Sequence, residues 1–446
     1  MPGPVGNGHA EAVATGIIDL DLTPPGQQRE PRAAWRLFTV PRPVLVAAVV
    51  LLLLLTLGAA GPPRRGITHL LSAGGQPAAA FVLADDALFT ASFGNNPNSE
   101  SAVRRWSLPD GRLGWALSLP QNVQNLVYDE SSGVLMGRSA NEPRVSFLDG
   151  DTGAVLWRDE SPNTAVMSIA SGHVLMLTDL EQQRATLRLL DARTGRLQWS
   201  RVVNDAYLGA DDLSDALPTR VVAADAAGHA QVLDVADGSV LARGELRVKL
   251  GAQYDNSPGA DYIGISTFGD ALYISRRDKG AATLTAFELD TLKLSWQATA
   301  AAAGGVLDCG RVLCVGGSEG VASVDPHDGR TLWRRSGLGL AYPYDGHTLL
   351  GYEGSDVPQA LLLDPATGAV RQRLGNAVAL TGVVLRADQV KLGRTWVEVA
   401  GEDGALHVVG VLETAAPFGC ELHGSYLACP TSAGPTQVWR IPLHLT

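Results

Sequence analysis

Short runs in which apolar and polar residues alternate fill most of the chain, and turn residues separate them. In Val145–Trp157 an alternating run ends at Asp149, an Asp/Thr/Gly turn follows, and a second run ends in tryptophan. Alternation with a period of two places successive side chains on opposite faces of a strand. Gly153 supplies the positive φ of a tight turn, and Asp and Thr side chains hold such turns closed. The pattern therefore predicts antiparallel strand pairs.

The same phrase recurs along the chain. Leu187–Trp199 and Val321–Trp333 repeat it closely, and weaker copies occupy Ala102–Trp115, Ala230–Ala242, Leu284–Trp296 and Ala360–Gln372. The turn glycines of the first four copies are 42, 42 and 43 residues apart. A period of roughly 40 residues built from strands is typical of a β-propeller. We therefore expect an all-β propeller over residues 78–446, with eight blades favoured and seven as the alternative.

The two ends of this region are less regular. Beyond Gly368 the register is lost, and Trp396–Val411 and Gly419–Ile441 fit either one irregular blade or nearly two. Propeller rings are often sealed by strands from both chain ends, which removes an exposed sheet edge. We expect Ile67–Ser72 to supply the outer strand of a blade whose inner strands include Thr436–Ile441.

Tryptophan and glycine occupy fixed slots in the repeat. A tryptophan is a large apolar plate that packs between blades while its indole N–H reaches a carbonyl, and the glycine forms the turn. A role in stacking a cofactor is the alternative for the tryptophans. The residues assigned to the repeat are Trp115, Trp157, Trp199, Trp296, Trp333, Gly153, Gly195, Gly329 and Gly368.

An apolar segment precedes the propeller. Val44–Gly61 is 18 residues long and carries no charge, which is near the lower limit for a transmembrane helix. Arginines cluster on its N-terminal side, so the positive-inside rule predicts a cytoplasmic, disordered tail (residues 1–43) and an extracytoplasmic propeller, joined by a linker (62–77). The protein is then a single-pass protein of the cell membrane. A cleavable signal peptide ending near Gly58–Ala60 is the competing interpretation.

All four cysteines follow the apolar segment. Cys309 and Cys314, and likewise Cys420 and Cys429, flank glycine-containing turns between strand-like runs. An even number of locally paired cysteines on the outside of a membrane predicts two disulfides. A zinc site is the alternative, although the spacings do not suit one.

The Asp-x-x-Thr-Gly-x-x-x-Trp phrase resembles the PQQ-like repeat. That repeat occurs in quinoprotein dehydrogenases and in non-enzymatic propellers similar to the bacterial outer-membrane assembly lipoprotein. The resemblance spans roughly residues 78–446 and implies the fold, but it leaves function open because members with and without the quinone share it. The vicinal cysteine pair found near the cofactor in many quinone enzymes is absent here. We therefore expect no cofactor.

Composition and motifs narrow the function classes further. The net charge of −11 argues against nucleic acid or anionic lipid as a general partner. No catalytic motif stands out, and no metal site is expected, since the acidic stretch Asp205–Asp215 fits a solvated turn better than a calcium loop. Asn-, Asp- and Gly-rich loops at Gly94–Ser101, Asn204–Pro218 and Gln253–Tyr262 are candidate contact sites.

Two functions from different classes remain. The first is a membrane-anchored, extracytoplasmic module that binds or scaffolds an unknown protein, peptide or other envelope component. The alternative is a quinone-dependent propeller oxidoreductase.

Overall fold

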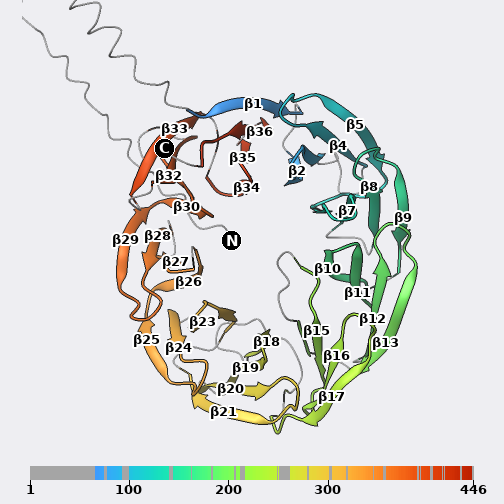
Figure 1. Cartoon of the computed structure of the whole chain (residues 1–446), viewed down its shortest axis with the longest axis vertical. Helices are drawn as coiled ribbons and strands as arrows, with labels where there is room; N and C mark the ends of the chain where they lie inside the picture. The colour runs from blue at the N-terminus through green and yellow to red at the C-terminus, as the bar shows by residue number, and fades with distance from the viewer. Residues whose placement is uncertain are drawn as a thin grey trace, which may run out of the picture. The chain divides into compact units, whose positions relative to one another are not determined.

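Four-stranded antiparallel sheets follow one another along the chain in the computed structural model (Figure 1). The predicted tail (1–43) and the predicted transmembrane segment (44–61) lie outside the described residues. Among the residues that are described, no helix is both long enough and apolar enough to cross a membrane. The structure describes residues 66–443 except for 75–77, 93–99, 140–143, 162, 182–183, 205–206, 211–215, 249, 251–261, 279–280, 301–303, 318–319, 345, 355–357, 389–390, 392, 402–404, 414, 416 and 432–433.

The described strands form nine sheets of four strands each, which are the blades of a propeller. Blades 1 to 3 contain β2 (Ala78–Leu83), β3 (Ala87–Ser92), β4 (Ser101–Ser107), β5 (Leu113–Leu119), β6 (Asn125–Asp129), β7 (Val134–Arg138), β8 (Val145–Asp149), β9 (Val155–Asp159), β10 (Ala165–Ala170), β11 (His173–Glu181), β12 (Arg184–Asp191) and β13 (Leu197–Asn204).

Blades 4 to 6 contain β14 (Tyr207–Ala210), β15 (Arg220–Ala224), β16 (His229–Asp234), β17 (Val240–Glu245), β18 (Tyr262–Phe268), β19 (Ala271–Asp278), β20 (Ala281–Glu288), β21 (Leu294–Thr299), β22 (Val306–Asp308), β23 (Leu313–Gly317), β24 (Gly320–Val324) and β25 (Thr331–Arg335). Blades 7 to 9 contain β26 (Leu338–Pro343), β27 (Leu349–Glu353), β28 (Gln359–Leu363), β29 (Val370–Gly375), β30 (Ala377–Leu380), β31 (Val383–Ala387), β32 (Arg394–Ala400), β33 (Leu406–Glu413), β34 (Glu421–His423), β35 (Tyr426–Thr431), β36 (Gly434–Arg440) and β1 (Thr68–Ala73).

Each blade runs outward from its first strand to its fourth. In Figure 1 the first strands, such as β10, β26 and β34, lie toward the centre, and the fourth strands, such as β5, β13 and β29, lie outside. Because neighbouring strands are antiparallel, the turns between first and second strands and between third and fourth strands share one end of the sheets. We call this end the turn face. The opposite end, which carries the links between second and third strands and between blades, is the connection face.

Strands from both ends of the described region form blade 9. β1 pairs antiparallel with β36, from Thr68 opposite Arg440 to Ala73 opposite Thr436. In Figure 1 the blue β1 lies beside the red β36. This is the pairing expected from the two chain ends, and it covers the edge that β36 would otherwise expose. Part of the predicted 62–77 linker is therefore a propeller strand.

The predicted blade number is wrong, since the structure has nine blades where eight were favoured and seven considered. Trp396–Val411 falls within blade 8, and Gly419–Ile441 falls within blade 9, so the irregular C-terminal region makes two blades. Blade 9 has no turn between its third and fourth strands, because those strands are β36 and β1. It therefore has no place for the Asp/Thr/Gly turn by which repeats are counted.

The tryptophans join neighbouring blades. The indole N–H of Trp115 donates to the carbonyl of Gly150 in the next blade at 2.9 Å, and a Cβ built on Gly153 would lie 2.6 Å from the Trp115 ring. The equivalent pairs are Trp157 with Ala192 and Gly195, Trp199 with Val235 and Gly238, Trp296 with Pro326 and Gly329, and Trp333 with Pro365 and Gly368. Each turn glycine thus leaves room for the tryptophan of the preceding blade.

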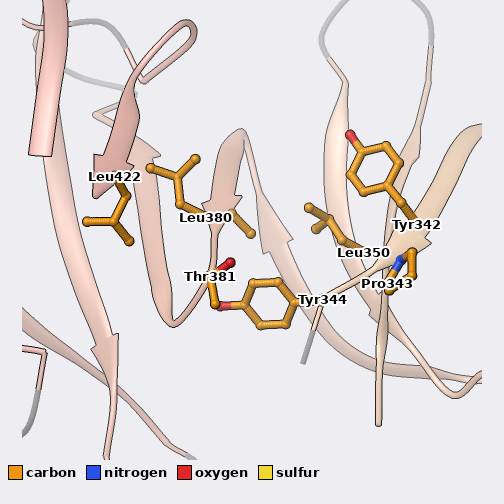
Figure 2. A pocket seen from close by; sticks show the side chains of 8 residues that line it. Tyr342, Pro343, Tyr344, Leu350, Leu380, Thr381 and Leu422 are labelled. Carbon is orange, nitrogen blue, oxygen red and sulfur yellow. The ribbon is translucent and has the colours of Figure 1, made fainter. Parts of the chain in front are cut away.

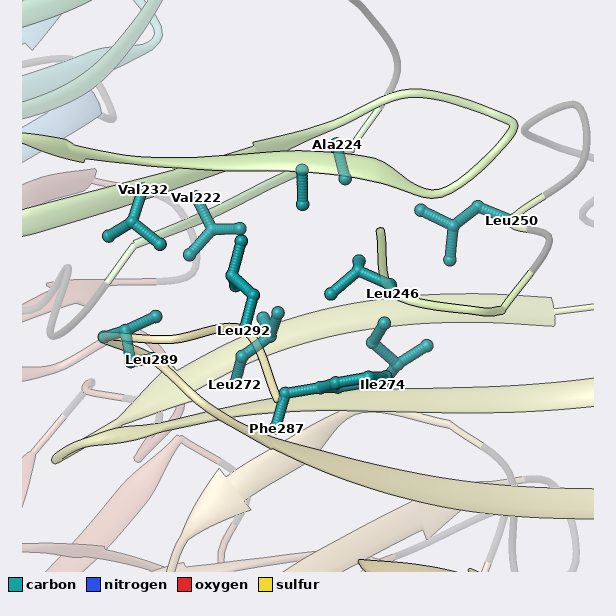
Figure 3. Close-up of a cluster of buried hydrophobic side chains, with 11 residues drawn as sticks. Val222, Ala224, Val232, Leu246, Leu250, Leu272, Ile274, Phe287, Leu289 and Leu292 are labelled. Carbon is teal, nitrogen blue, oxygen red and sulfur yellow. The ribbon is translucent and has the colours of Figure 1, made fainter. Parts of the chain in front are cut away.

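Between blades 4 and 5, different residues stand in place of the tryptophan–glycine pair. Ala242 stands in the tryptophan slot, and Leu292 stands in the glycine slot of the next turn with φ +53°. The Leu292 side chain is buried and packs in the apolar cluster between the two blades (Figure 3). It fills space that a tryptophan occupies elsewhere, so the two departures from the repeat compensate each other.

Both predicted disulfides form. Cys309 pairs with Cys314 and Cys420 pairs with Cys429, with Cα atoms 5.8 Å and 4.2 Å apart. Each disulfide links the first two strands of a blade whose first strand, β22 or β34, has only three residues. So short a strand forms few ladder hydrogen bonds, and the disulfide supplies a second constraint on its position.

Candidate functional site

The innermost strand of blade 9, β34, borders two chemically different environments. Its three residues are Glu421, Leu422 and His423. Alternate side chains of a strand point to opposite faces. Leu422 therefore lines a cavity shared with blades 7 and 8, while Glu421 and His423 reach blade 1 on the other side. The Cys420–Cys429 disulfide anchors this strand to its neighbour β35.

The cavity has a volume of about 300 Å³ and lies near the turn face. Figure 2 shows Leu422 beside Leu380 on one side and Leu350 beside Tyr342 on the other, with the Tyr344 ring near Thr381. The first strands of three successive blades, β26, β30 and β34, contribute to its wall, which is completed by Pro343 and Ala379. Its lining is mostly apolar and aromatic, as in pockets that bind small molecules or side chains.

Tyr342 adds a neutral polar group to the wall. Burial, followed by the neighbouring Tyr352, raises the pKa of Tyr342 to about 12. The phenol therefore keeps its proton near neutral pH. Its ring lies 6.1 Å from that of Tyr352.

Three side chains meet on the other side of β34. His423 Nε2 lies 3.0 Å from Asp85 Oδ1 and 3.3 Å from Glu130 Oε1, and the Asp85 backbone N–H donates to Glu130 at 3.2 Å. These residues come from the first turns of blades 9, 1 and 2. Within the described parts of the chain, this group has ligand atoms close enough together to hold a metal ion. Both carboxylates are exposed and already lie beside the imidazole, so we interpret the group as a polar side-chain network that joins three blades.

Glu421 crosses the same seam. Its Oε2 accepts a hydrogen bond from the Leu83 backbone N–H at 3.1 Å. Burial raises the pKa of the Glu421 carboxyl to about 7, and the Leu83 N–H only partly opposes this shift. The carboxyl therefore changes its charge close to neutral pH.

Charges are distributed unevenly between the two ends of the ring. On the turn face, Arg105 lies 2.8 Å from Asp86 and 3.8 Å from Asp151, and Arg220 lies 3.2 Å from each of two aspartates, Asp270 and Asp290. Each of these arginines is therefore outnumbered by carboxylates.

On the connection face both arrangements occur, since Arg394 lies 3.7 Å from Asp388 and 3.3 Å from Glu413. Glu353 lies 3.2 Å from both Arg335 and Arg373. The aspartates that close the repeat turns also lie at the turn face, where Asp149, Asp325 and Asp364 each pair with an arginine. Hydrogen bonds from Arg193 and Thr152 hold the pKa of Asp149 at about 2, so this carboxylate stays charged.

The site predicted from sequence lies elsewhere, in part outside the described residues. Segments 93–99, 211–215 and 251–261, which include most of the three candidate loops, are not described. The flanking strands differ in orientation: Ser92 and Tyr262 lie at the connection face, and Ala210 lies at the turn face. The described residues that flank the three segments therefore lie at both ends of the blades.

Three histidines, His173, His229 and His423, stand beside turn glycines in the sequence, a position typical of a solvated loop. His173 and His229 bond to residues of their own turns, Ser171 and Asp225. His423 instead reaches two neighbouring blades. Sequence reasoning missed this, since His423 and Asp85 are 338 positions apart and no motif connects them.

Comparison with known proteins agrees with the blade geometry. The family described as outer membrane protein assembly factor BamB matches residues 99–259, from β4 to beyond blade 4. The resemblance to the PQQ-like repeat is thereby confirmed. No curated protein matches the chain at a significant level.

Several solved structures resemble this chain at low sequence identity. The computationally designed Ika8 protein is 14% identical, with 84% of this chain and 100% of that chain covered and a TM-score of 0.46. BamB from Moraxella catarrhalis is 14% identical, with 82% and 95% covered and a TM-score of 0.45. The dihydro-heme d1 dehydrogenase NirN in complex with DHE is 11% identical, with 71% and 67% covered and a TM-score of 0.43.

Proposed function

We propose that this propeller is a binding or scaffolding module that holds a protein or peptide of the cell envelope, outside the membrane to which Val44–Gly61 anchors it. The observation that carries the proposal is the cavity beside β34. Leu350, Leu380 and Leu422, which come from three blades, form its apolar walls. An apolar cavity on a rigid scaffold is suited to receiving a side chain of a partner.

The chemistry of the site also favours binding. Tyr342, one of its two tyrosines, is a neutral phenol, and the nearby carboxylates are engaged with His423 or a backbone N–H. These contacts hold side chains in place across blade seams. They provide a rigid frame for recognition.

A photo-crosslinking amino acid at position 344 tests the proposal in the full chain in its native envelope. Val202, on the outer strand β13 and 65% exposed, is the control position. We expect discrete adducts from position 344 and none from position 202. Thr381→Trp should abolish them, because Thr381 is an exposed turn residue at the cavity and the indole would fill it. Val202→Trp should leave them unchanged. Adducts that are equal at both positions, or insensitive to Thr381→Trp, would count against the proposal.

A second assay on the full chain tests the alternative function, a quinone-dependent oxidoreductase. The purified chain is mixed with the quinone and calcium, and absorbance and dye-linked alcohol oxidation are measured. We expect neither binding nor turnover, and turnover would reject the scaffold function.

A further inference from the structure

The cavity beside β34 opens near an end of the ring whose charge is mainly negative. The described residues of the turns between first and second strands include four carboxylates and one arginine: Asp85, Asp86, Glu130, Asp270 and Arg311. These turns encircle the centre of the ring on the turn face, where Tyr344 and Thr381 of the cavity also lie. A partner bound at the cavity and extending over this face would therefore meet carboxylates at blades 1, 2 and 5.

Ion pairing within the propeller leaves this charge in excess. Arg105 and Arg220 each face two carboxylates, so pairing with them still leaves a negative charge at each place. At the connection face, Glu353 faces two arginines and Arg394 faces two carboxylates. At the end that carries the cavity, these pairs therefore leave carboxylates in excess of arginines. Complementary charges steer association and exclude partners of like charge.

We propose that the cavity binds one large apolar side chain of a cationic polypeptide segment, whose Lys or Arg residues lie along the carboxylates of the turn face. This inference rests on the proposed binding function and specifies the class of partner. The apolar walls, formed by Leu350, Leu380 and Leu422, and the neutral phenol of Tyr342 suit an uncharged side chain. A lysine or arginine in the cavity itself would lose hydration without a carboxylate among its lining residues.

Four fluorescent peptides test the two requirements separately. The first has a central Phe flanked by Lys and Ser. The second replaces Phe by Ala, the third replaces Lys by Glu, and the fourth carries both changes. Fluorescence anisotropy with the full chain should show binding of the first peptide, with Kd weaker by roughly tenfold or more for each single change. Raising the ionic strength from about 0.1 M to about 1 M, which shortens the Debye length from ~10 Å to ~3 Å, should weaken the first complex.

Variants of the protein provide the matched controls. Thr381→Trp should abolish the advantage of Phe over Ala, and Val202→Trp should leave it. Asp85→Asn combined with Glu130→Gln should reduce the advantage of Lys over Glu. Glu100→Gln, an exposed carboxylate at the connection face, should leave it. Circular dichroism confirms that each variant is folded.

The outcomes separate this inference from the binding function on which it rests. If the Glu peptide binds as tightly as the Lys peptide, if Phe gives no advantage, or if no peptide binds, the cationic, apolar-anchored partner is refuted. Crosslinks from position 344 that Thr381→Trp removes would then still support a binding module for a different ligand. Loss of both results would reject both proposals.

Discussion

Replacing a turn glycine with alanine tests the packing between blades. A Cβ added to Gly153 would lie 2.6 Å from Trp115 Cδ2 and 2.7 Å from Cε3, at a backbone φ of +72°. The left-handed conformation costs an alanine about 1–2 kcal/mol, and displacing a packed ring costs about 1–3 kcal/mol more. Gly153→Ala should therefore lower the free energy of unfolding by about 2–5 kcal/mol.

A second glycine isolates the contribution of the tryptophan. Gly172 has nearly the same backbone conformation, with φ +77°, but its added Cβ would meet only Ser132 Cβ at 3.9 Å. Gly172→Ala should therefore cost only the conformational term of about 1–2 kcal/mol. The difference between the two losses of unfolding free energy gives the cost of displacing the Trp115 ring.

Urea unfolding, followed by circular dichroism and tryptophan fluorescence, provides the measurement. A shift in midpoint at constant m reports stability alone. In a Trp115→Ala background the extra cost of Gly153→Ala should disappear, because the ring that it strikes is gone. If the two glycine substitutions destabilise the protein equally, within about 0.5 kcal/mol, the tryptophan does not require a glycine opposite it.

Three further substitutions probe other seams. Glu421→Gln should raise the free energy of unfolding by about 2–3 kcal/mol at about pH 8 and change it little at about pH 4. The native pKa of Glu421 is raised to about 7, so the stability that the protonated carboxyl provides at low pH is lost as the pH rises through this value. A urea midpoint of the variant equal to that of the original protein at both pH values would contradict this. Ala242→Trp and Leu292→Gly should each destabilise the protein, whereas the double variant should recover a coupling energy of about 1–3 kcal/mol, and strict additivity would exclude compensation. Replacing Cys420 and Cys429 by Ala should cost about 2–3 kcal/mol and speed amide exchange in β34 first, and unchanged exchange there would mean that the disulfide does not hold the strand.

The repeat could be predicted from local sequence because its cause is local. Alternation, the Asp/Thr/Gly turn and the terminal tryptophan all act within a few residues, and the disulfides close short hairpins. The partners of the tryptophan were harder to predict. The indole N–H of Trp157 donates to the carbonyl of Ala192, 35 positions away in the next blade. The motif of a single repeat does not reveal that its turn glycine packs against the tryptophan of the preceding blade.

The β34 site could not be predicted from the sequence in the same way. Glu421 meets Leu83, and His423 meets Asp85, only because ring closure brings residues 338 positions apart into contact. The site also lies in blade 9, which lacks the repeat motif. Without that motif, the sequence pattern does not show where the strands of this blade begin and end. Leu422 forms one wall of the cavity, but in the sequence it is an ordinary apolar residue between two polar ones.

The packing contacts between neighbouring blades explain the number of blades better than the number of repeat motifs does. Gly111 is the turn glycine of blade 1, and no earlier blade in the sequence provides a tryptophan to pack on it. In the structure Leu71 of β1 takes that place, with its Cβ 2.9 Å from a Cβ built on Gly111. The turn glycine of the first repeat packs against a side chain of the preceding blade, as the other turn glycines do. For blade 1, the preceding blade in the ring is the one that closes it. Adding that blade and blade 8 to the seven copies of the phrase gives the nine blades observed.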